Sequence, residues 1–341
     1  MLDWFSGYVG YDASALETGW FYEVDLGGEM LRRSRRWRTA VGSFESGVQV
    51  TRGAATDAML ADAQEYGFLC SQEVLRVSGN PSKYLQGHNA AGPSVRLLGP
   101  VLQGLVRAFG EGVRPPDADA LALPAVHRSR LDVTTAVDLG THEAVHDWIA
   151  FAAARTRSKH GRAIDSSGTV YWGKHSTRWS MKAYCKWCEL QVHPPSDVAL
   201  LADLLEWTRN HLRIELTLRR PELKDRGTLD ESIIWEFFSR LELRAMKSRL
   251  YAPEHLRPVL RLVLESWYGG SEFKSMPFPR RTRFRYRREI LDGTGVDISL
   301  PYKDQQGTLA RATLLGMDEL RAREVKDVPA RIQRSLFGAG V

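Results

Sequence analysis

The chain has few cysteines and no long apolar run. Three cysteines among 341 residues are too few for a disulfide framework. No run approaches the roughly 18 apolar residues of a membrane span, and residues 1–6 lack the basic and then apolar layout of a secretion signal. We therefore expect a cytoplasmic protein without a membrane segment.

Common metal-binding patterns are also missing. Cys185-x-x-Cys188 has no second Cys or His pair at the usual zinc spacing. We therefore expect neither a zinc site nor a redox site there.

What the chain does contain is an ordinary globular composition with unevenly placed charge. Hydrophobic residues make up 43% and charged residues 26%, which suits a soluble protein long enough for two domains. The net charge is only +6, but residues 31–38 hold five arginines and residues 280–288 hold six more, interleaved with Phe284 and Tyr286. Guanidinium groups pair with phosphates and aromatic faces stack on unpaired bases, so the clusters favour a nucleic-acid partner. A solvated basic face is the alternative for either cluster.

Tyr184-x-Lys186-x-x-Glu189 combines a phenol, a cation and a carboxylate. It follows a cationic and aromatic run that contains Lys174 and Arg178. A phenol nucleophile beside a cation and a possible metal ligand suits covalent attack on a phosphodiester. A half-buried tyrosine among solvated charges is the alternative that the motif alone leaves open.

Hydrophobic periodicity predicts the elements that flank this motif. Residues 130–139 alternate as a strand with Asp132 on its polar face, and residues 212–219 alternate as a strand with Arg213 and Glu215 on one face. Residues 141–155 have the period of a helix. Helical patterns dominate beyond Pro221. We expect an α+β fold in which an antiparallel sheet carries the site on one face and helices cover the other, with an endonuclease domain over 1–226 and a mostly helical DNA- or partner-binding region over 227–341.

Several segments together resemble one protein family. The segments 80–89, 129–134, 184–189 and 212–215 appear in the order seen in the replication initiators of filamentous bacteriophages, the gene-two and gene-X replication family. The likeness extends from about residue 75 to residue 226.

The resemblance implies a rolling-circle initiator, an enzyme that nicks one strand of phage origin DNA, as single strand or supercoiled duplex. By this analogy Tyr184 attacks the scissile phosphate, leaving a 5′-phosphotyrosine and a free 3′-hydroxyl, and the enzyme later rejoins the displaced strand. The family resemblance also implies a host helicase and a host DNA polymerase as partners, in the cytoplasm of a bacterial host. A divalent cation, Mg²⁺ or Mn²⁺, would polarise the phosphate.

The site residues follow less directly, because the wider superfamily usually holds its metal with His-hydrophobic-His and this chain has no His-x-His. Carboxylates suit Mg²⁺ or Mn²⁺, so we expect Asp132, Glu189 and Glu215 as ligands, with His88 as either a fourth ligand or a structural hydrogen-bonding group. Lys186 is expected to contact phosphate or to lower the pKa of Tyr184. The expected DNA-binding residues are Lys83, Arg130, Lys174, Arg178, Arg213, Arg283, Arg285 and Arg287.

Two other functions remain open. His127-x-x-Arg130 fits the His-x-x-Arg of tyrosine recombinases, which work without metal through a 3′-phosphotyrosine, although Arg130 falls on a predicted strand. The basic clusters alone would also suit a non-catalytic DNA-binding protein that acts in replication or regulation.

Overall fold

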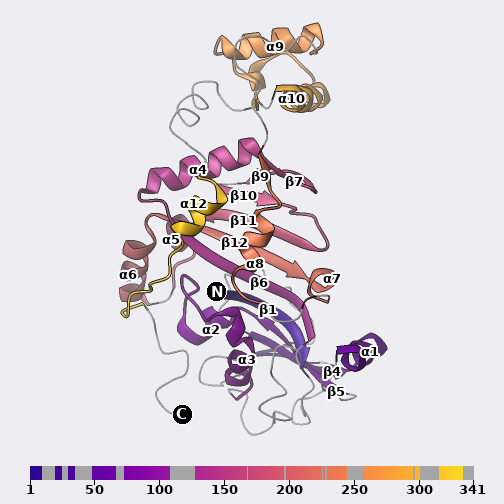
Figure 1. Cartoon of the computed structure of the whole chain (residues 1–341), viewed down its shortest axis with the longest axis vertical. Coiled ribbons are helices and arrows are strands. Elements are labelled where there is room, and N and C mark those ends of the chain that lie inside the picture. Colours follow the sequence, from indigo (N-terminus) through magenta and orange to yellow (C-terminus); the bar gives the residue numbers. More distant parts are fainter. Residues whose placement is uncertain are drawn as a thin grey trace.

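A computed structural model of the whole chain shows an α+β protein built on one large antiparallel sheet (Figure 1). It describes residues 1–9, 20–24, 30–34, 48–66, 73–107, 127–166, 168–195, 197–224, 226, 229–243, 256–294, 296–299 and 315–332. Within these residues the sheet has ten strands in the order β3-β2-β4-β5-β1-β6-β12-β11-β10-β9. Their bounds are β1 Leu2–Val9, β2 Phe21–Val24, β3 Met30–Ser34, β4 Val48–Ala54, β5 Glu73–Gly79, β6 His127–Asp138, β9 Ile164–Ser166, β10 Thr169–Trp172, β11 Trp179–Cys185 and β12 His211–Arg219.

The centre of the sheet is formed by β6, β12 and β11. Their register pairs Asp132 with Thr217 and Thr134 with Glu215, and it pairs Lys182 with Glu215 across the next ladder. Since side chains alternate along a strand, one face of β6 and β12 carries Val133, Ile214 and similar buried apolar residues, and the other carries polar ones. The strands predicted over 130–139 and 212–219 are confirmed.

Helices cover the apolar face of these strands. The helix α4 (His142–Arg155) begins where the Thr141 hydroxyl accepts a hydrogen bond from the Ala144 amide at 3.1 Å, as expected of an N-cap. Its residues Val145, Trp148 and Ile149 join the main core with residues of α8 (Ile233–Phe238) and of α12 (Met317–Ala322). The helix predicted over 141–155 is confirmed.

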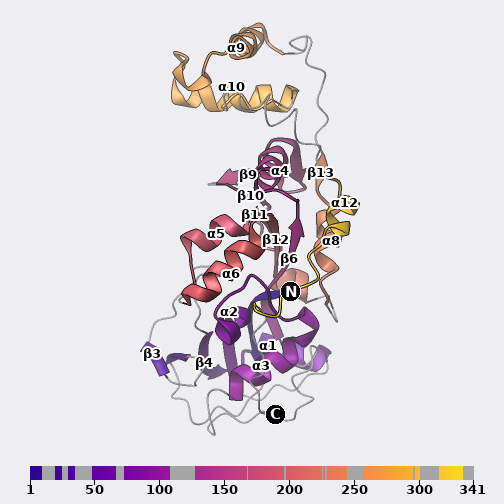
Figure 2. The same cartoon turned by 90° about the vertical axis from the view of Figure 1, so that its left-hand side faces the viewer.

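Two further helices lie on the opposite side of the sheet from α8 and α12 (Figure 2). These are α5 (Lys186–Val192) and α6 (Val198–Thr208), which pack against each other, and α5 also contacts β11 and β12. Helix α2 (Pro81–Gln86) contacts β1. The other elements are α1 Asp57–Tyr66, α3 Leu98–Arg107, α7 Arg220–Leu223, two 3₁₀ turns (Val95–Leu97 and Phe273–Ser275), and a small sheet of β7 Thr156–Ser158, β8 Gly161–Arg162 and β13 Glu242–Leu243.

A second hydrophobic core belongs to the C-terminal part of the chain. Helices α9 (Pro258–Tyr268) and α10 (Arg280–Thr294) build it around Leu264, Trp267 and Ile290, and they confirm the expected helical C-terminal region. Residues beyond them return to the sheet, because the Val325 amide donates to the Ala136 carbonyl at 2.9 Å. The boundary at residues 226 and 227 stays a prediction. Within the described residues, no helix has the length and apolar character required to cross a membrane.

Candidate active site

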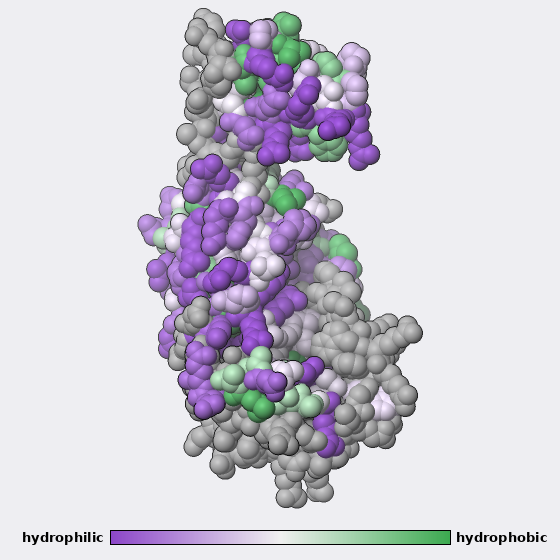
Figure 3. All heavy atoms as spheres, turned by 90° about the vertical axis from the view of Figure 1, so that its right-hand side faces the viewer, coloured by the Kyte–Doolittle hydropathy of each residue, from purple (hydrophilic) through white to green (hydrophobic). Residues whose placement is uncertain are grey.

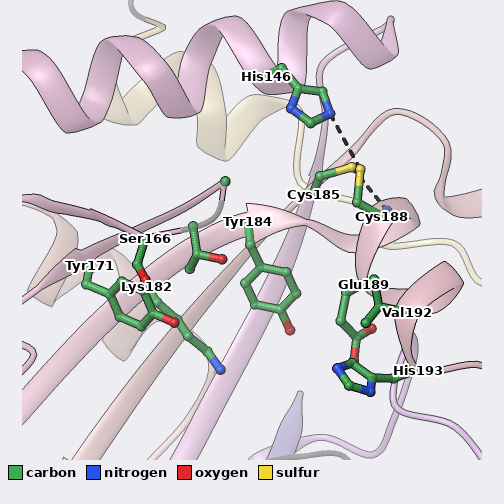
Figure 4. A pocket seen from close by; sticks show the side chains of 12 residues that line it. His146, Ser166, Tyr171, Lys182, Tyr184, Cys185, Cys188, Glu189, Val192 and His193 are labelled. Carbon is green, nitrogen blue, oxygen red and sulfur yellow. Dashed lines mark hydrogen bonds between the residues drawn. The ribbon is translucent and has the colours of Figure 1, made fainter. Parts of the chain in front are cut away.

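Tyr184 stands next to last on β11 and lines a cavity of about 520 Å³ (Figure 4). Strands β9 to β11 and helix α5 supply most of the walls, and His146 of α4 supplies another part. In Figure 4 the phenol ring lies between Lys182 and Glu189, with its hydroxyl pointing away from α4. Of the residues predicted for catalysis or metal binding, Tyr184 and Glu189 line this cavity.

The surroundings of Tyr184 keep its phenol protonated. Burial raises the pKa of Tyr184 well above its usual value, and the carboxylates of Glu215 and Glu189 raise it further, whereas the Arg213 guanidinium lowers it. The side chain is only 7% exposed. Nucleophilic attack by this oxygen therefore needs a proton acceptor or added positive charge at the hydroxyl.

Lys182 is the lysine that lies against the ring of Tyr184, with its ammonium 5.2 Å from the ring centroid. It faces Glu215 across the strand ladder, with Nζ 2.8 Å from Oε1. Burial raises the pKa of Glu215 to about 7, against the effect of Lys182. Burial lowers the pKa of Lys182, but Glu215 reverses this and raises it to about 12. The sequence motif did not single out Lys182, although the two-residue spacing on one strand puts it on the same face as Tyr184.

Lys186 and Glu189 belong to the first turn of α5, which begins directly after β11. The Lys186 ammonium donates to Asn89 Oδ1 at 2.9 Å and lies 2.5 Å from Glu189 Oε2. Burial lowers the pKa of Lys186, and Glu189 opposes this shift. Lys186 is thus placed as a buried partner of Glu189, and its expected contact with phosphate stays a prediction.

Asp3, on the N-terminal strand, lies among the buried charged side chains of Arg213 and Lys186, which the sequence did not indicate. Its Oδ1 accepts hydrogen bonds from Asn80 Nδ2 at 3.0 Å and Asn89 Nδ2 at 2.8 Å, and it lies 3.7 Å from Arg213. Burial raises the pKa of Asp3, but Arg213, the Asn89 hydrogen bond and Lys186 bring it below its usual value. No local motif marks Asp3, because its partners are 77 or more positions away in the chain.

Arg213 and Lys83, both expected DNA contacts, are also buried around this centre. Arg213 donates to the backbone carbonyls of Asn89 at 2.8 Å and Ala90 at 3.0 Å. Burial lowers the pKa of Lys83, while the nearby carboxylates of Glu189 and Asp3 raise it. The segment 80–90 therefore meets β12 and α5 through charged side chains.

Asp132 and His88 already have partners for the groups that would bind a metal. Both carboxylate oxygens of Asp132 accept from the Arg130 guanidinium, at 2.9 and 2.5 Å. His88 Nε2 lies 3.2 Å from the Ile332 carbonyl, and its Nδ1 accepts from the Ala90 amide at 3.3 Å. These contacts correspond to the structural alternative for His88.

Among the described residues, the four predicted metal ligands do not form a converging group of three or more ligands. Three carboxylates nevertheless keep a buried oxygen without a partner there, namely Asp3 Oδ2, Glu189 Oε1 and Glu215 Oε2. Unpaired carboxylate oxygens suit a hard cation, and Mg²⁺ is usually held by one or two carboxylates together with substrate phosphates. The donor set therefore fits such an ion at Glu189 and Glu215 better than at Asp132 and His88.

None of the remaining expected DNA contacts lines the cavity around Tyr184. Lys174 lies over the ring of Tyr171, 4.3 Å from its centroid, and Tyr171 lines the cavity. Arg178 donates to Glu222 at 3.0 Å. Arg283, Arg285 and Arg287 all belong to α10, where Arg283 donates to the Lys274 carbonyl and Arg287 pairs with Asp297. Of the first arginine cluster, residues 35–38 lie outside the described residues.

The residues of the recombinase pattern are placed away from the cavity. His127 stacks on Tyr8 with ring centroids 4.0 Å apart. Arg130 is held by Asp132 and lies 5.2 Å from the ring of Trp4. Neither residue lines the cavity around Tyr184, so the geometry does not favour a recombinase.

The fold brings a histidine pair to Cys185 and Cys188, although no such pair stands at the usual zinc spacing in the sequence. His142 and His146, one turn apart on α4, bring their ring nitrogens to these two thiols, and the four ligand atoms all lie within 4.8 Å of one another. The pairs are 42 and 43 positions apart in the sequence, which is longer than the spacing of common zinc motifs. His142-x-x-x-His146 was the available signal, since residues four apart share one helix face.

Comparisons with known proteins place the chain in one family. The family model for the N-terminal region of the phage gene-two replication-associated protein matches residues 1–244. A relative, the gene-two replication-associated protein of Enterobacteria phage I2-2, is 28% identical over 319 residues, which cover 88% of this chain and 88% of that protein.

Proposed function

Since the chain belongs to the family of gene-two replication-associated proteins, we propose that it starts rolling-circle replication by nicking and rejoining phage origin DNA through Tyr184. The observation that carries this proposal is the position of Tyr184 in a cavity wall, between Lys182 and Glu189. A phenol with cations and carboxylates on both sides has the groups that phosphodiester transesterification needs.

The reaction exchanges one phosphodiester bond for another. The Tyr184 hydroxyl oxygen attacks the phosphorus, the bond from phosphorus to the 3′-oxygen breaks, and the 3′-oxygen leaves as a hydroxyl after taking up a proton. The products are a 5′-phosphotyrosine and a free 3′-end, from which a host DNA polymerase would extend with the help of a host helicase. Rejoining is the reverse attack by a 3′-hydroxyl, so no nucleotide cofactor is needed.

The proton of Tyr184 must leave because the buried phenol has a raised pKa. The partnerless oxygen Glu215 Oε2 is the proposed acceptor. Glu215 pairs with Lys182, and the Lys182 ammonium lies 5.2 Å from the centroid of the Tyr184 ring. A pKa of about 7 leaves Glu215 partly ionised at neutral pH, as a general base requires.

The charge around the cavity suits a phosphate. Lys182, Lys186, Arg213 and Lys83 oppose the carboxylates of Asp3, Glu189 and Glu215, so cations exceed anions by one. We propose that a phosphate group of the DNA neutralises this excess positive charge. Mg²⁺ or Mn²⁺ held by the partnerless oxygen of Glu189 would add Lewis-acid polarisation of the phosphate.

A matched pair of tyrosine variants tests the proposal. Tyr184 and Tyr171 line the same cavity from neighbouring strands, and a change to phenylalanine removes only the hydroxyl. With origin DNA and Mg²⁺, Tyr184→Phe should neither nick nor form a covalent adduct, while Tyr171→Phe should do both. Melting temperature and DNA affinity should stay near wild type in each. Normal nicking by Tyr184→Phe would reject the assignment, and DNA binding without nicking by the wild type would favour the non-catalytic alternative.

A further inference from the structure

We propose that His142, His146, Cys185 and Cys188 form a structural zinc site that joins helix α4 to the strand and helix carrying Tyr184 and Glu189. The four side chains come from helix α4 and from the junction between β11 and α5. His142 and His146 lie on the first turns of α4, Cys185 ends β11, and Cys188 lies on the first turn of α5.

The distances between the ligand atoms fit one tetrahedral ion. Cys188 Sγ is 3.5 Å from His146 Nε2, the two histidine Nε2 atoms are 3.1 Å apart, and the ligand atoms of all four residues lie within 4.8 Å of one another. Tetrahedral zinc with bonds of roughly 2.3 Å to sulfur and 2.0 to 2.1 Å to nitrogen separates its ligand atoms by roughly 3.3 to 3.8 Å. The four side chains are thus close enough to converge on one zinc ion.

The contacts around these side chains prepare them as ligands. His142 Nδ1 lies 3.2 Å from the Arg209 carbonyl, and a metal-binding histidine commonly donates its other ring N–H in this way. That arrangement leaves His142 Nε2, the atom nearest His146, for the metal. The Cys188 amide points at Cys185 Sγ at 3.4 Å, and Trp187 packs edge-on against His142 with centroids 4.8 Å apart.

The chemistry of the donors selects the ion and its role. Two thiolates and two imidazoles in a tetrahedron favour zinc over Mg²⁺ or Mn²⁺, which prefer oxygen ligands. Four protein ligands leave no open position, which is typical of a structural zinc rather than a catalytic one. Such an ion would fix the chain on both sides of the active site, because Tyr184 precedes Cys185 directly and Glu189 follows Cys188 directly. This inference does not depend on the nicking activity.

Metal analysis of the purified full chain tests the site. Protein prepared under reducing conditions, without chelator or added zinc, should contain one zinc per chain by elemental mass spectrometry. His146→Ala and Cys188→Ser should lose it. Two controls should keep it: His193→Ala, which alters another histidine of the same cavity, and Cys70→Ser, which alters the third cysteine.

A measurement on the wild type keeps the test decisive if the variants fail to fold. Replacing zinc by Co²⁺ should produce the visible bands of tetrahedral cobalt and a thiolate charge-transfer band, and excess zinc should abolish both. Chelation should lower the melting temperature and zinc should restore it. A wild-type chain that folds without zinc and gives no thiolate band with Co²⁺ would overturn the proposal, as would a disulfide between Cys185 and Cys188 in the active protein.

Discussion

Tyr184 lies between two groups of potential metal ligands that differ in chemistry. One group holds carboxylates among lysines and an arginine, with Lys182 on Glu215 and Lys186 on Glu189. The other group holds two thiols and two imidazoles within 4.8 Å of one another. In the first, each carboxylate has a cationic partner and keeps one oxygen without a partner, which suits a substrate and an ion that bind and dissociate. In the second, the thiols and imidazoles face one another and the Arg209 carbonyl lies beside His142, which suits an ion that stays bound.

Removing a ligand from each group should give the largest difference between them, in nicking rate for one group and in melting temperature for the other. Glu189→Gln and Glu215→Gln keep the size of the side chain but remove its charge, so we expect single-turnover nicking to fall by about 100-fold or more, the magnitude seen when electrostatic stabilisation is lost. Cys188→Ser should lower the melting temperature more than it lowers the rate of the protein that remains folded. The surface variant Glu242→Ala should change neither. Equal rate losses in Cys188→Ser and Glu215→Gln would remove the distinction between the groups.

Exchanging the bound metal should distinguish the roles of the two groups of ligands without any mutation. Chelator should abolish nicking and lower the melting temperature together. Re-adding Mg²⁺ or Mn²⁺ to a zinc-loaded chain should restore nicking with little further rise in melting temperature, and zinc alone should restore the melting temperature but not nicking. Nicking rates and thermal melts on the same samples measure this. Full nicking in excess chelator would contradict the proposed role of a divalent ion in catalysis.

The titration of Glu215 should also make the stability of the folded chain depend on pH. The pKa of Glu215 is raised from 4.5 to about 7 in the folded chain, so the folded state holds this proton more tightly than the unfolded state does. Its contribution to stability is complete below pH 4.5 and is lost as the pH rises through 7, by at most about 3 kcal/mol at roughly 1.4 kcal/mol per unit. Denaturant unfolding from pH 4.5 to 8 should therefore show a flatter slope for Glu215→Gln than for wild type. Identical slopes would show that Glu215 does not titrate there.

The smallest expected effect concerns the cationic helix α10, away from both ligand groups. Arg281, Phe284, Arg285 and Arg288 are exposed at the spacing of one helix face, and the unit of α9 and α10 shows hydrophilic and hydrophobic patches side by side at the top of Figure 3. If this face binds the phosphates of DNA, replacing its three arginines by alanine should reduce the slope of log affinity against log salt concentration by about 2.

Arg287→Ala is the matched control for that triple variant. Arg287 pairs with Asp297 at 2.5 Å, so its loss should lower stability and leave the salt slope nearly unchanged. Salt titrations beside thermal melts measure both effects. An unchanged slope in the triple variant, at an unchanged melting temperature, would show that this face does not touch DNA.

Local patterns in the sequence were sufficient to predict the central strands and α4. One face of each of these elements is buried, so apolar residues must recur at the period of a strand or a helix. This explains the alternation over 130–139 and 212–219 and the helical period over 141–155. The contiguous motif also placed Tyr184 and Glu189 together, and both line one cavity. The coarse function followed from the resemblance of several such motifs, in their order along the chain, to one protein family.

What could not be predicted depends on which elements pack together. Asp3 reaches the site through β1, and the histidine pair meets Cys185 and Cys188 only because α4 lies over the end of β11. The arginine cluster over 280–288 does not distinguish its two aromatic residues in the sequence, so both Phe284 and Tyr286 were expected to stack on bases. On a helix they point about 200° apart, and Phe284 is 59% exposed while Tyr286 is 9% exposed. Tyr286 therefore belongs to a core and cannot stack on bases.

During nicking the Tyr184 oxygen should become covalently bonded to DNA, and mapping the covalent peptide by mass spectrometry measures this bond. The full chain is incubated with labelled origin DNA from the genome that encodes it and with Mg²⁺, then digested with protease and nuclease and sequenced by mass spectrometry. We expect a single modified peptide, with a 5′-phosphate on Tyr184 and a free 3′-hydroxyl on the other DNA end. A nucleotide on Tyr171 or any other residue, or a bond through a 3′-phosphate, would contradict it.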